Sequence, residues 1–306
     1  MRAKAIVKIC ICGTIALVLA SMLVSLLALP RVLDWKIGDL SFHWIDDHGG
    51  DEGYTVGEAS VSGEVRELDV SWLSGSVTVE LTDGDAVTLR EEPQPESSDA
   101  RMRWKLQDGK LTVYSQKSGL TIPTRAKQLT IGIPAGRAGK LQKLSLDLSA
   151  ATASLPALTL RELELDSVSG SVTLTGGAYE KLDFDSTSGD LTLTSAAVGE
   201  LSADTTSGSL TLDGAFETID FDTTSGALHL TTSILPQDIS CDTVSGGVTL
   251  TLPENGGFSA TLDSVSGDLT VDGFAGSLHR DEFVYGQGGP AYEFDSVSGD
   301  VHIRCA

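Results

Sequence analysis

Hydrophobic and polar residues alternate along the second half of the chain in a pattern that repeats. The stretch from Asp166 to Leu174 reads DSVSGSVTL, and near copies follow as DSTSGDLTL, DTTSGSLTL, DTTSGALHL, DTVSGGVTL, DSVSGDLTV and DSVSGDVHI. Their glycines lie at intervals of 19, 19, 18, 20, 21 and 32 residues. A degenerate copy, DLSAATASL, begins at Asp147. Asp147 lies 19 residues before Asp166, which lies 19 residues before Asp185. A constant short period indicates an architecture of stacked repeats.

Each repeat contains two short alternating segments joined by a Ser-Gly corner. The first reads LELD, LDFD, LSAD, IDFD, ISCD or YEFD, and the second reads VTL, LTL, LHL or VHI. Alternation with a period of two is typical of β-strands, and Ser-Gly between strands is typical of a turn. One repeat cannot bury its own apolar side chains, but stacked repeats can, each strand pairing with the next about 4.8 Å away. The sequence predicts an all-β fold, a parallel β-solenoid of about eight short coils.

The corner residues are expected to be structural. Glycine suits a corner where a Cβ would clash or where φ is positive. The aspartate before it can accept hydrogen bonds from corner N–H groups, and the following Ser or Thr can do the same. The predicted corners are Asp166, Gly170, Asp185, Gly189, Asp204, Gly208, Asp222, Gly226, Asp242, Gly246, Asp263, Gly267, Asp295 and Gly299.

One outward-facing column offers a candidate ligand face. Its threonines form a flat, regularly spaced set of hydroxyl groups, which suits ordered surfaces such as polysaccharide or ice. His229 and His302 fall in the same column. The alternative is that threonine is simply a favoured polar residue on an exposed strand. The threonines are Thr173, Thr192, Thr211, Thr249 and Thr270.

Both ends of the predicted stack need covering, because bare strand edges pair with neighbouring chains. Residues 55–146 are strand-like without the period and are expected to form an N-terminal β-rich cap. Residues 147–306 carry the repeats. The long last interval contains FVYGQGGPAYEF, residues 283–294, which is expected to fold as a C-terminal hairpin over the last coil.

The beginning of the chain predicts a membrane anchor. The uncharged run at 9–29 spans roughly 31 Å as a helix, close to one bilayer core. It ends in LALPR instead of a small-x-small cleavage site, which favours an uncleaved anchor over a secretory signal. Arg2, Lys4 and Lys8 precede it and place residues 1–8 in the cytoplasm. Residues 30–54 are then a juxtamembrane linker, and everything that follows is extracytoplasmic.

The charge of the chain limits its partners. Its formal net charge is −22, and three of its basic residues precede the anchor. Phosphate-rich partners would be repelled by such a surface, so nucleic acid is not expected. The partners expected are the membrane and then a cell-wall polymer, host matrix or membrane signalling proteins.

Several of these segments together carry a family resemblance. They are the recurring D-[ST]-[VT]-S-G units, the upstream LDVSWLSGSVTVE, the approach LTIGIPAGRAGKLQKLSLDL and the closing FVYGQGG. Over residues 55–306 the chain resembles the bacterial "putative adhesin" family of β-strand repeat proteins, a domain of unknown function common in Gram-positive cell envelopes. The resemblance implies an exported, solenoid-like domain, with no catalytic residues to carry over.

The residues themselves indicate no enzyme. None of the five histidines stands in a recognised nucleophile arrangement, and paired acids such as Asp183 and Asp185 recur with the repeat instead of standing apart in a cleft. The run HWIDDHGGDE, residues 43–52, offers metal ligands but is interpreted as a solvated linker. No catalytic, cofactor or metal residue is assigned.

These observations predict a non-catalytic binding or structural module, adhesin-like, at the bacterial cell envelope. The alternative is an accessory component of envelope-stress signalling that acts through membrane partners.

Overall fold

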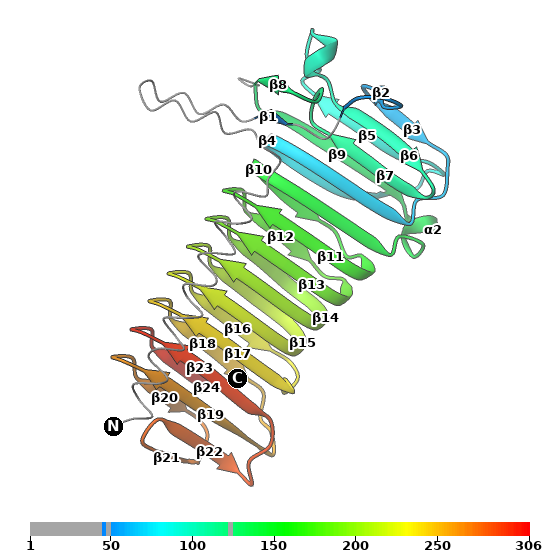
Figure 1. Ribbon diagram of the computed structural model, residues 1–306. Helices are drawn as coiled ribbons and strands as arrows, with labels where there is room; N and C mark the ends of the chain where they lie inside the picture. The colour runs from blue at the N-terminus through cyan, green and yellow to red at the C-terminus, as the bar shows by residue number, and fades with distance from the viewer. Residues whose placement is uncertain (1–44, 47–49, 122–124) are drawn as a thin grey trace, which may run out of the picture.

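The computed structural model describes residues 45–46, 50–121 and 125–306. Within these ranges almost all regular structure is β-strand, with one four-residue helix, α2 (Ala135–Ala138), and one 3-10 turn, Ser98–Ala100. Most strands run side by side in one long stack, from cyan at one end to orange and red at the other (Figure 1). The prediction of an all-β fold with repeated parallel strands is confirmed.

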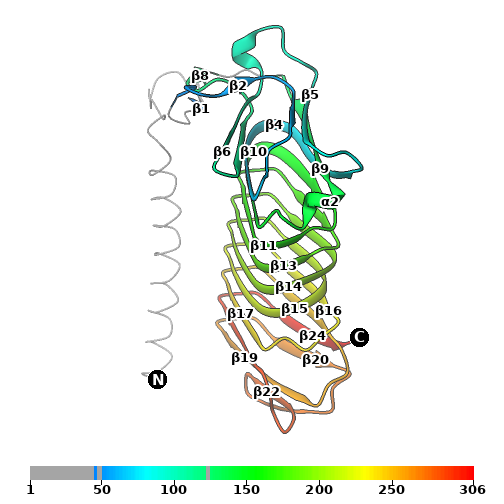
Figure 2. The same cartoon turned by 90° about the vertical axis from the view of Figure 1, so that its right-hand side faces the viewer.

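The stack is built from rungs, each consisting of two strand segments joined by a corner. The segments of one rung lie on two opposite faces, which Figure 2 shows from the side. The strands that form the rungs are β4 (Glu67–Thr82), β10 (Lys143–Leu155), β11 (Thr159–Ser167), β12 (Val172–Thr175), β13 (Ala178–Ser186), β14 (Leu191–Thr205), β15 (Leu210–Thr223), β16 (Leu228–Thr232), β17 (Asp238–Thr243), β18 (Val248–Leu252), β19 (Gly257–Ser264), β20 (Leu269–Asp272), β23 (Ala291–Ser296) and β24 (Val301–Cys305).

Parallel pairing keeps equivalent residues of successive repeats in register. Leu163 pairs with Leu182, and Leu182 pairs with Leu201, each one repeat further along the chain. β14 and β15 each contribute to two successive rungs, because their first residues pair on one face and their later residues on the other. A side chain that points inward in one rung therefore points inward in the next.

The core lies between the two faces. Leu163 and Leu165 enter it from one face, Val172 and Leu174 from the other, and each is at most 1% exposed. Burying such side chains stabilises the fold by about 1.5–3 kcal/mol each. A single rung has only one layer of them, so neighbouring rungs are needed to exclude water.

Large and small side chains alternate along one column of the core. From rung to rung the column reads Phe184, Ala203, Phe221, Cys241, Phe294. All five are buried. Rungs at strand spacing cannot easily carry an aromatic ring at every level, and the small residues leave room for the rings of their neighbours.

Periodicity alone misses a rung that lies upstream of the repeats. β4 pairs in parallel with β10, so that Leu68 stands opposite Leu144 and Gly75 opposite Ala151. Its sequence, LDVSWLSGSVTV, has the alternation and the Ser-Gly corner of a repeat. The regular spacing is lost because residues 83–142 form other strands between the two rungs.

Those other strands cover the N-terminal end of the stack. β7 (Lys110–Tyr114) and β9 (Lys127–Pro134) extend the parallel pairing beyond β4. β5 (Val87–Glu92) pairs antiparallel with β9, and β6 (Arg103–Gln107) pairs antiparallel with β7. The shorter strands are β1 (Ile45–Asp46), β2 (Thr55–Val56), β3 (Ala59–Val61) and β8 (Leu120–Thr121).

A buried ion pair ties this end region together. Lys127 Nζ lies 2.7 Å from Glu91 Oε1, and the side chains are 4% and 1% exposed. Lys127 Nζ also donates to the carbonyl oxygens of Ala100 and Ser115 and lies over the ring of Trp72. The buried charges are therefore satisfied by several partners, as buried charges must be.

The C-terminal end differs from the expected order. β23 and β24, the last strands of the sequence, are not outermost: β23 pairs with β17 on one side and β19 on the other. β24 lies in the same way between β18 and β20. In Figure 1 the red rung accordingly lies between the yellow and the orange ones.

The prediction that residues 283–294 form the closing hairpin is therefore wrong in its bounds. The hairpin consists of β21 (Ser277–His279) and β22 (Glu282–Gly286), and β22 covers the outer edge of β19. Tyr292 and Phe294 belong instead to the inserted rung and are buried. The long last interval contains both the hairpin and the return of the chain into the stack.

The predicted anchor at 9–29 lies outside the described residues, as does half of the 43–52 run. In the part of the chain that the structure describes, no helix has the length and apolar character needed to cross a membrane.

Candidate ligand face

In seven of the rungs, a hydroxyl group holds the corner between the two faces. The Oγ of Ser167 accepts a hydrogen bond from Gly170 N at 2.9 Å, and Thr205 Oγ1 accepts one from Gly208 N at 2.8 Å. The same contact recurs in the other rungs, from Gly189, Gly226, Gly246, Gly267 and Gly299.

The expectation that the corner aspartates share this role is wrong. All seven lie in the described part of the chain, and in each corner the glycine N–H donates to the Ser or Thr hydroxyl that follows the aspartate. The reason is the alternation of the strand, which turns the hydroxyl inward, toward the corner, and the neighbouring carboxylate outward.

The corner glycines are required for close approach between rungs. A Cβ on Gly189 would lie 2.2 Å from the carbonyl oxygen of Gly170, and the other corners are as tight. None of the seven corner glycines, which all lie among the described residues, has a positive φ, so the second reason given for glycine does not apply. A Cβ on Gly299 would clash with the carbonyl oxygen of Gly246, and a Cβ on Gly267 would clash with that of Gly299. The corner of the last repeat in the sequence therefore also lies between the corners of two earlier repeats.

The corner aspartates form a ladder on one face of the stack. Asp166 stands opposite Asp147 and Asp185, and the register continues to the end of the stack through Asp204, Asp222, Asp242, Asp295 and Asp263. Their side chains point outward beside further acids, which include Glu164, Asp183, Asp220 and Glu293. We call this surface the acidic face.

Proximity within the ladder changes the ionisation of its carboxyl groups. Partial removal from water, with added repulsion from Asp147, raises the pKa of Asp166 to about 6. The same causes, with Asp242 as the strongest repelling neighbour, raise the pKa of Asp222 to about 7. Part of the ladder therefore carries protons near neutral pH.

The opposite face is dominated by hydroxyl groups, and we call it the threonine face. It consists of β12, β16, β18, β20 and β24 with the first parts of β14 and β15. The five predicted threonines lie here in one column, in the order Thr173, Thr192, Thr211, His229, Thr249, His302 and Thr270. All seven side chains are exposed or half-buried.

The column extends further than the predicted set. Thr173 stands opposite Ser154, which stands opposite Thr78, which in turn stands opposite Thr130 of β9. The regular spacing of the repeats does not identify these three residues. Ser154 lies in the degenerate copy, and Thr78 and Thr130 lie upstream of the periodic part of the sequence. The signal that could have found them is LSGSVTV in β4, where Thr78 occupies the position of Thr173.

A second column runs beside the first, and three of its seven residues are charged. At its C-terminal end, Asp272 Oδ2 lies 2.8 Å from His302 Nε2, and Arg304 Nε donates to Thr251 Oγ1 at 2.8 Å. The threonine face is thus far less charged than the acidic face. In order along the stack, the second column consists of Thr175, Thr194, Asp213, Thr231, Thr251, Arg304 and Asp272.

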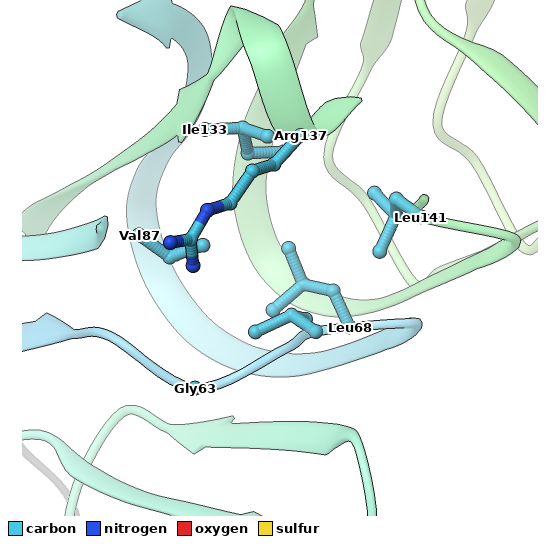
Figure 3. Close-up of a pocket in the computed structure, with 7 residues that line it drawn as sticks. Gly63, Leu68, Val87, Ile133, Arg137 and Leu141 are labelled. Carbon is cyan, nitrogen blue, oxygen red and sulfur yellow. The ribbon is translucent and has the colours of Figure 1, made fainter. Parts of the chain in front are cut away.

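Two concave features lie near the N-terminal end. An open hollow of about 480 Å³ borders the end of the threonine column and is lined in part by Thr130, Thr88, Glu80 and Arg90. The second feature is an apolar cavity of about 20 Å³ between Leu68, Ile133 and Leu141 and their neighbours, with Arg137 along its rim (Figure 3). The cavity has room for one water molecule at most, so it does not hold a ligand.

One acidic group on the acidic face has the spacing of metal ligands. It consists of Glu162, Glu164 and Asp183. Lys143 Nζ lies 2.5 Å from Glu164, and Lys181 Nζ lies 2.8 Å from Asp183. The lysines already neutralise these carboxylates, which leaves little charge for a cation to compensate.

The fold and this face define a class: an all-β repeat protein with stacked parallel rungs and two chemically distinct faces. The chain belongs to the Toastrack DUF4097 family, whose model matches residues 65–304. This membership confirms the resemblance found in the sequence. No curated protein matches the chain.

Solved structures that match this chain include proteins from two bacterial species, Bacteroides fragilis and Parabacteroides distasonis. A "putative adhesin" from Bacteroides fragilis is 13% identical with a TM-score of 0.50, over 83% of this chain and 98% of that one. A "putative lipid binding protein" from Parabacteroides distasonis is 14% identical with a TM-score of 0.49, over 84% and 98%. A "putative adhesin" from the latter organism is 11% identical with a TM-score of 0.37, over 84% and 98%. At 13% identity, the likeness to the Bacteroides fragilis structure concerns the fold alone.

Proposed function

We propose that this chain is a non-catalytic binding module of the bacterial cell envelope, whose threonine face binds a neutral polysaccharide. The observation that carries the proposal is the column from Thr130 to Thr270, in which hydroxyl-bearing residues follow one another rung by rung, with two histidines among them. The fold is interpreted as a parallel β-solenoid, a rigid rod with a flat side.

Regular spacing suits a repeating ligand. Each hydroxyl group can donate and accept weak hydrogen bonds to a sugar. Single contacts of this kind contribute little, but contacts at a common spacing of about 4.8 Å add when the ligand also repeats. Rigidity helps, because the face loses little freedom on binding.

The separation of charge between the two faces supports a neutral ligand. The acidic face would repel anionic polymers, whereas the two columns of the threonine face carry three acidic or basic residues: Asp213 in the middle, and Asp272 and Arg304, which are hydrogen-bonded at one end. An uncharged glycan can approach the threonine face with little cost in desolvated charge. Nucleic acid is a poor partner for either face.

The cellular setting of the proposal comes from the beginning of the chain. The segment 9–29 would anchor the chain in the membrane, with residues 1–8 in the cytoplasm and the rod outside the cell. The proposed location is a Gram-positive envelope, where the rod would stand among wall glycans. The name of the Bacteroides fragilis neighbour, a "putative adhesin", is consistent with such a role.

The test is binding of the detergent-solubilised full chain to insoluble chitin, cellulose and purified cell wall. The test variant carries Thr192→Lys and Thr211→Lys, and the matched control carries Ser202→Lys and Ser240→Lys on the acidic face. We expect the test variant to lose at least about tenfold in affinity, or about 1.4 kcal/mol, and the control to bind normally. Equal losses in both, or no binding of any glycan, would refute the assignment. Co-purification with membrane regulators in the absence of glycan binding would favour the signalling alternative.

A further inference from the structure

The last rung of the sequence occupies an internal place in the stack. β23 and β24 pair along one edge with β17 and β18 and along the other with β19 and β20. The chain therefore completes the β19–β20 rung and the β21–β22 hairpin before returning to fill the space between two earlier rungs. We call this space the slot; its walls are β17–β18 and β19–β20.

Both walls of the slot fit the inserted segment in register. Asp295 stands between Asp242 and Asp263, and Ser296 stands between Thr243 and Ser264. At the corners, Ser298 Oγ donates to the carbonyl of Val244, and Ser266 Oγ donates in the same way to the carbonyl of Val297. The walls thus offer hydrogen-bonding groups and side-chain columns to an incoming strand that carries the repeat motif.

Two contacts make the slot specific for residues 291–305. Tyr292 is 1% exposed, and its hydroxyl donates to the carbonyl of Pro236 at 3.0 Å. Phe294 is buried in register with Cys241, the small member of the alternating core column. A repeat without an aromatic residue at that position would leave space beside Cys241. The repeat of β19 has Leu262 there.

The inserted rung is joined to the rest by a short glycine-rich linker. Gly286 ends β22, Ala291 begins β23, and Gly286, Gly288 and Gly289 all have positive φ. Gly286 pairs with Gly257, while Ala291 pairs with Ser259 across the other edge of β19. The linker therefore crosses the start of β19 and spans two strand spacings, about 9.6 Å.

We infer that the slot is a strand-acceptor site and that a second copy of this chain can supply residues 291–305 to it, so that copies join by exchanging their C-terminal rungs. The exchanged and the unexchanged forms would make the same pairings in the slot. Their balance is therefore set by protein concentration and by whether the linker can make the crossing within one molecule.

Linker length gives a direct test in the full chain. Deleting residues 287–289 leaves two Cα–Cα intervals between Gly286 and Ala291, which reach about 7 Å and cannot make the crossing. This variant is expected to elute as dimers or larger oligomers. A variant with an extra Gly-Ser-Gly after Gly288 is expected to remain monomeric at the same concentration. The mass of both variants is measured by light scattering.

A cross-linking experiment reports exchange itself. One tagged chain carries Thr249→Cys and a differently tagged chain carries His302→Cys, both with Cys10, Cys12 and Cys305 replaced by Ser. Residues 249 and 302 are direct neighbours across β18 and β24. A disulfide that joins positions 249 and 302 of differently tagged chains, identified by peptide mapping so that bonds to Cys241 are not counted, reports that β24 of one chain lies in the slot of the other.

Mixed-tag disulfides that increase with concentration after unfolding and refolding, and increase further with the shortened linker, would support exchange. Cooperatively folded protein that gives no mixed-tag product at any linker length would overturn it. If the shortened variant does not fold, cross-linking of the chains with the original linker still tests the proposal, because exchange predicts mixed-tag product from these chains at high concentration.

Discussion

The carbonyl oxygen of Gly189 lies 2.0 Å from the place where a Cβ of residue 208 would stand. No side chain tolerates such an approach, so the rungs can stack at the corners only while Gly208 lacks one. Thr205 Oγ1 lies 2.9 Å from the same place and already accepts a hydrogen bond from Gly208 N. The corner therefore combines a steric requirement with a hydrogen bond.

Gly208→Ala should destabilise the protein by about 2–4 kcal/mol, because the backbone of one rung must move away from the next. The matched control is Gly136→Ala in α2, where nothing lies within 4 Å of an added Cβ. The control should change the free energy of unfolding by less than about 0.5 kcal/mol. Urea denaturation of both variants measures the difference, and a wild-type midpoint for Gly208→Ala would contradict the close approach.

Thr205→Val tests the hydroxyl at the same corner. The change keeps the shape of a side chain that is 2% exposed and removes the acceptor of the hydrogen bond from Gly208 N. A buried N–H left without a partner costs about 1–3 kcal/mol, whereas Thr205→Ser should retain most of the stability. Thr211→Val, on the exposed threonine face, serves as the control. If Thr205→Val and Thr211→Val melt alike, the hydroxyl does not hold the corner.

Acidification should stabilise the stack. The pKa of Asp166 and of Asp185 is raised to about 6, and that of Asp222 to about 7, by partial removal from water and by neighbouring carboxylates. In the unfolded chain an aspartate has a pKa of about 3.9. The folded state therefore holds more protons between about pH 4 and pH 7, and the contribution of these groups to stability falls as the pH rises through that window.

The measurement is the melting temperature from pH 5 to pH 8. Asp222→Asn should raise it at pH 8 and flatten the profile, because one repelling charge is removed from the ladder. Asp213→Asn, outside the ladder, should leave the profile unchanged. A wild-type protein that melts higher at pH 8 than at pH 5 would show that the ladder does not govern the pH dependence.

Glu91→Gln should destabilise the N-terminal end by about 3–5 kcal/mol, because it leaves the buried Lys127 without its counter-charge. Glu91→Leu combined with Lys127→Met should recover much of the loss, since neither buried charge of this pair is then left without its partner. The exposed pair of Arg161 and Glu180, 3.7 Å apart, is the control. Its removal should cost less than about 1 kcal/mol. Equal effects of the buried and exposed pairs, measured by denaturation, would contradict this account.

Much of the candidate face could be predicted from short-range pattern. Alternation about a Ser-Gly corner indicated that Thr173 points away from the core residues Val172 and Leu174, and the constant period aligned its equivalents. The same alternation could have corrected the role expected of the corner aspartates, because it turns Asp166 outward and Ser167 inward. Ser167 and Asp166 are adjacent and both can accept hydrogen bonds, and only the inward direction of Ser167 brings its oxygen to the corner N–H.

The sequence by itself determined the strands, the corners and the side of the sheet on which each residue lies, because these follow from contacts between residues close together in the chain. Only the tertiary structure decided the order of the rungs. The repeats DSVSGDLTV and DSVSGDVHI begin with the same letters, DSVSGD, so either can stack on β17–β18 by local rules. The choice depends on distant contacts, the ring of Phe294 beside Cys241 and the hydroxyl of Tyr292 on Pro236, which exist only after the chain has returned into the stack.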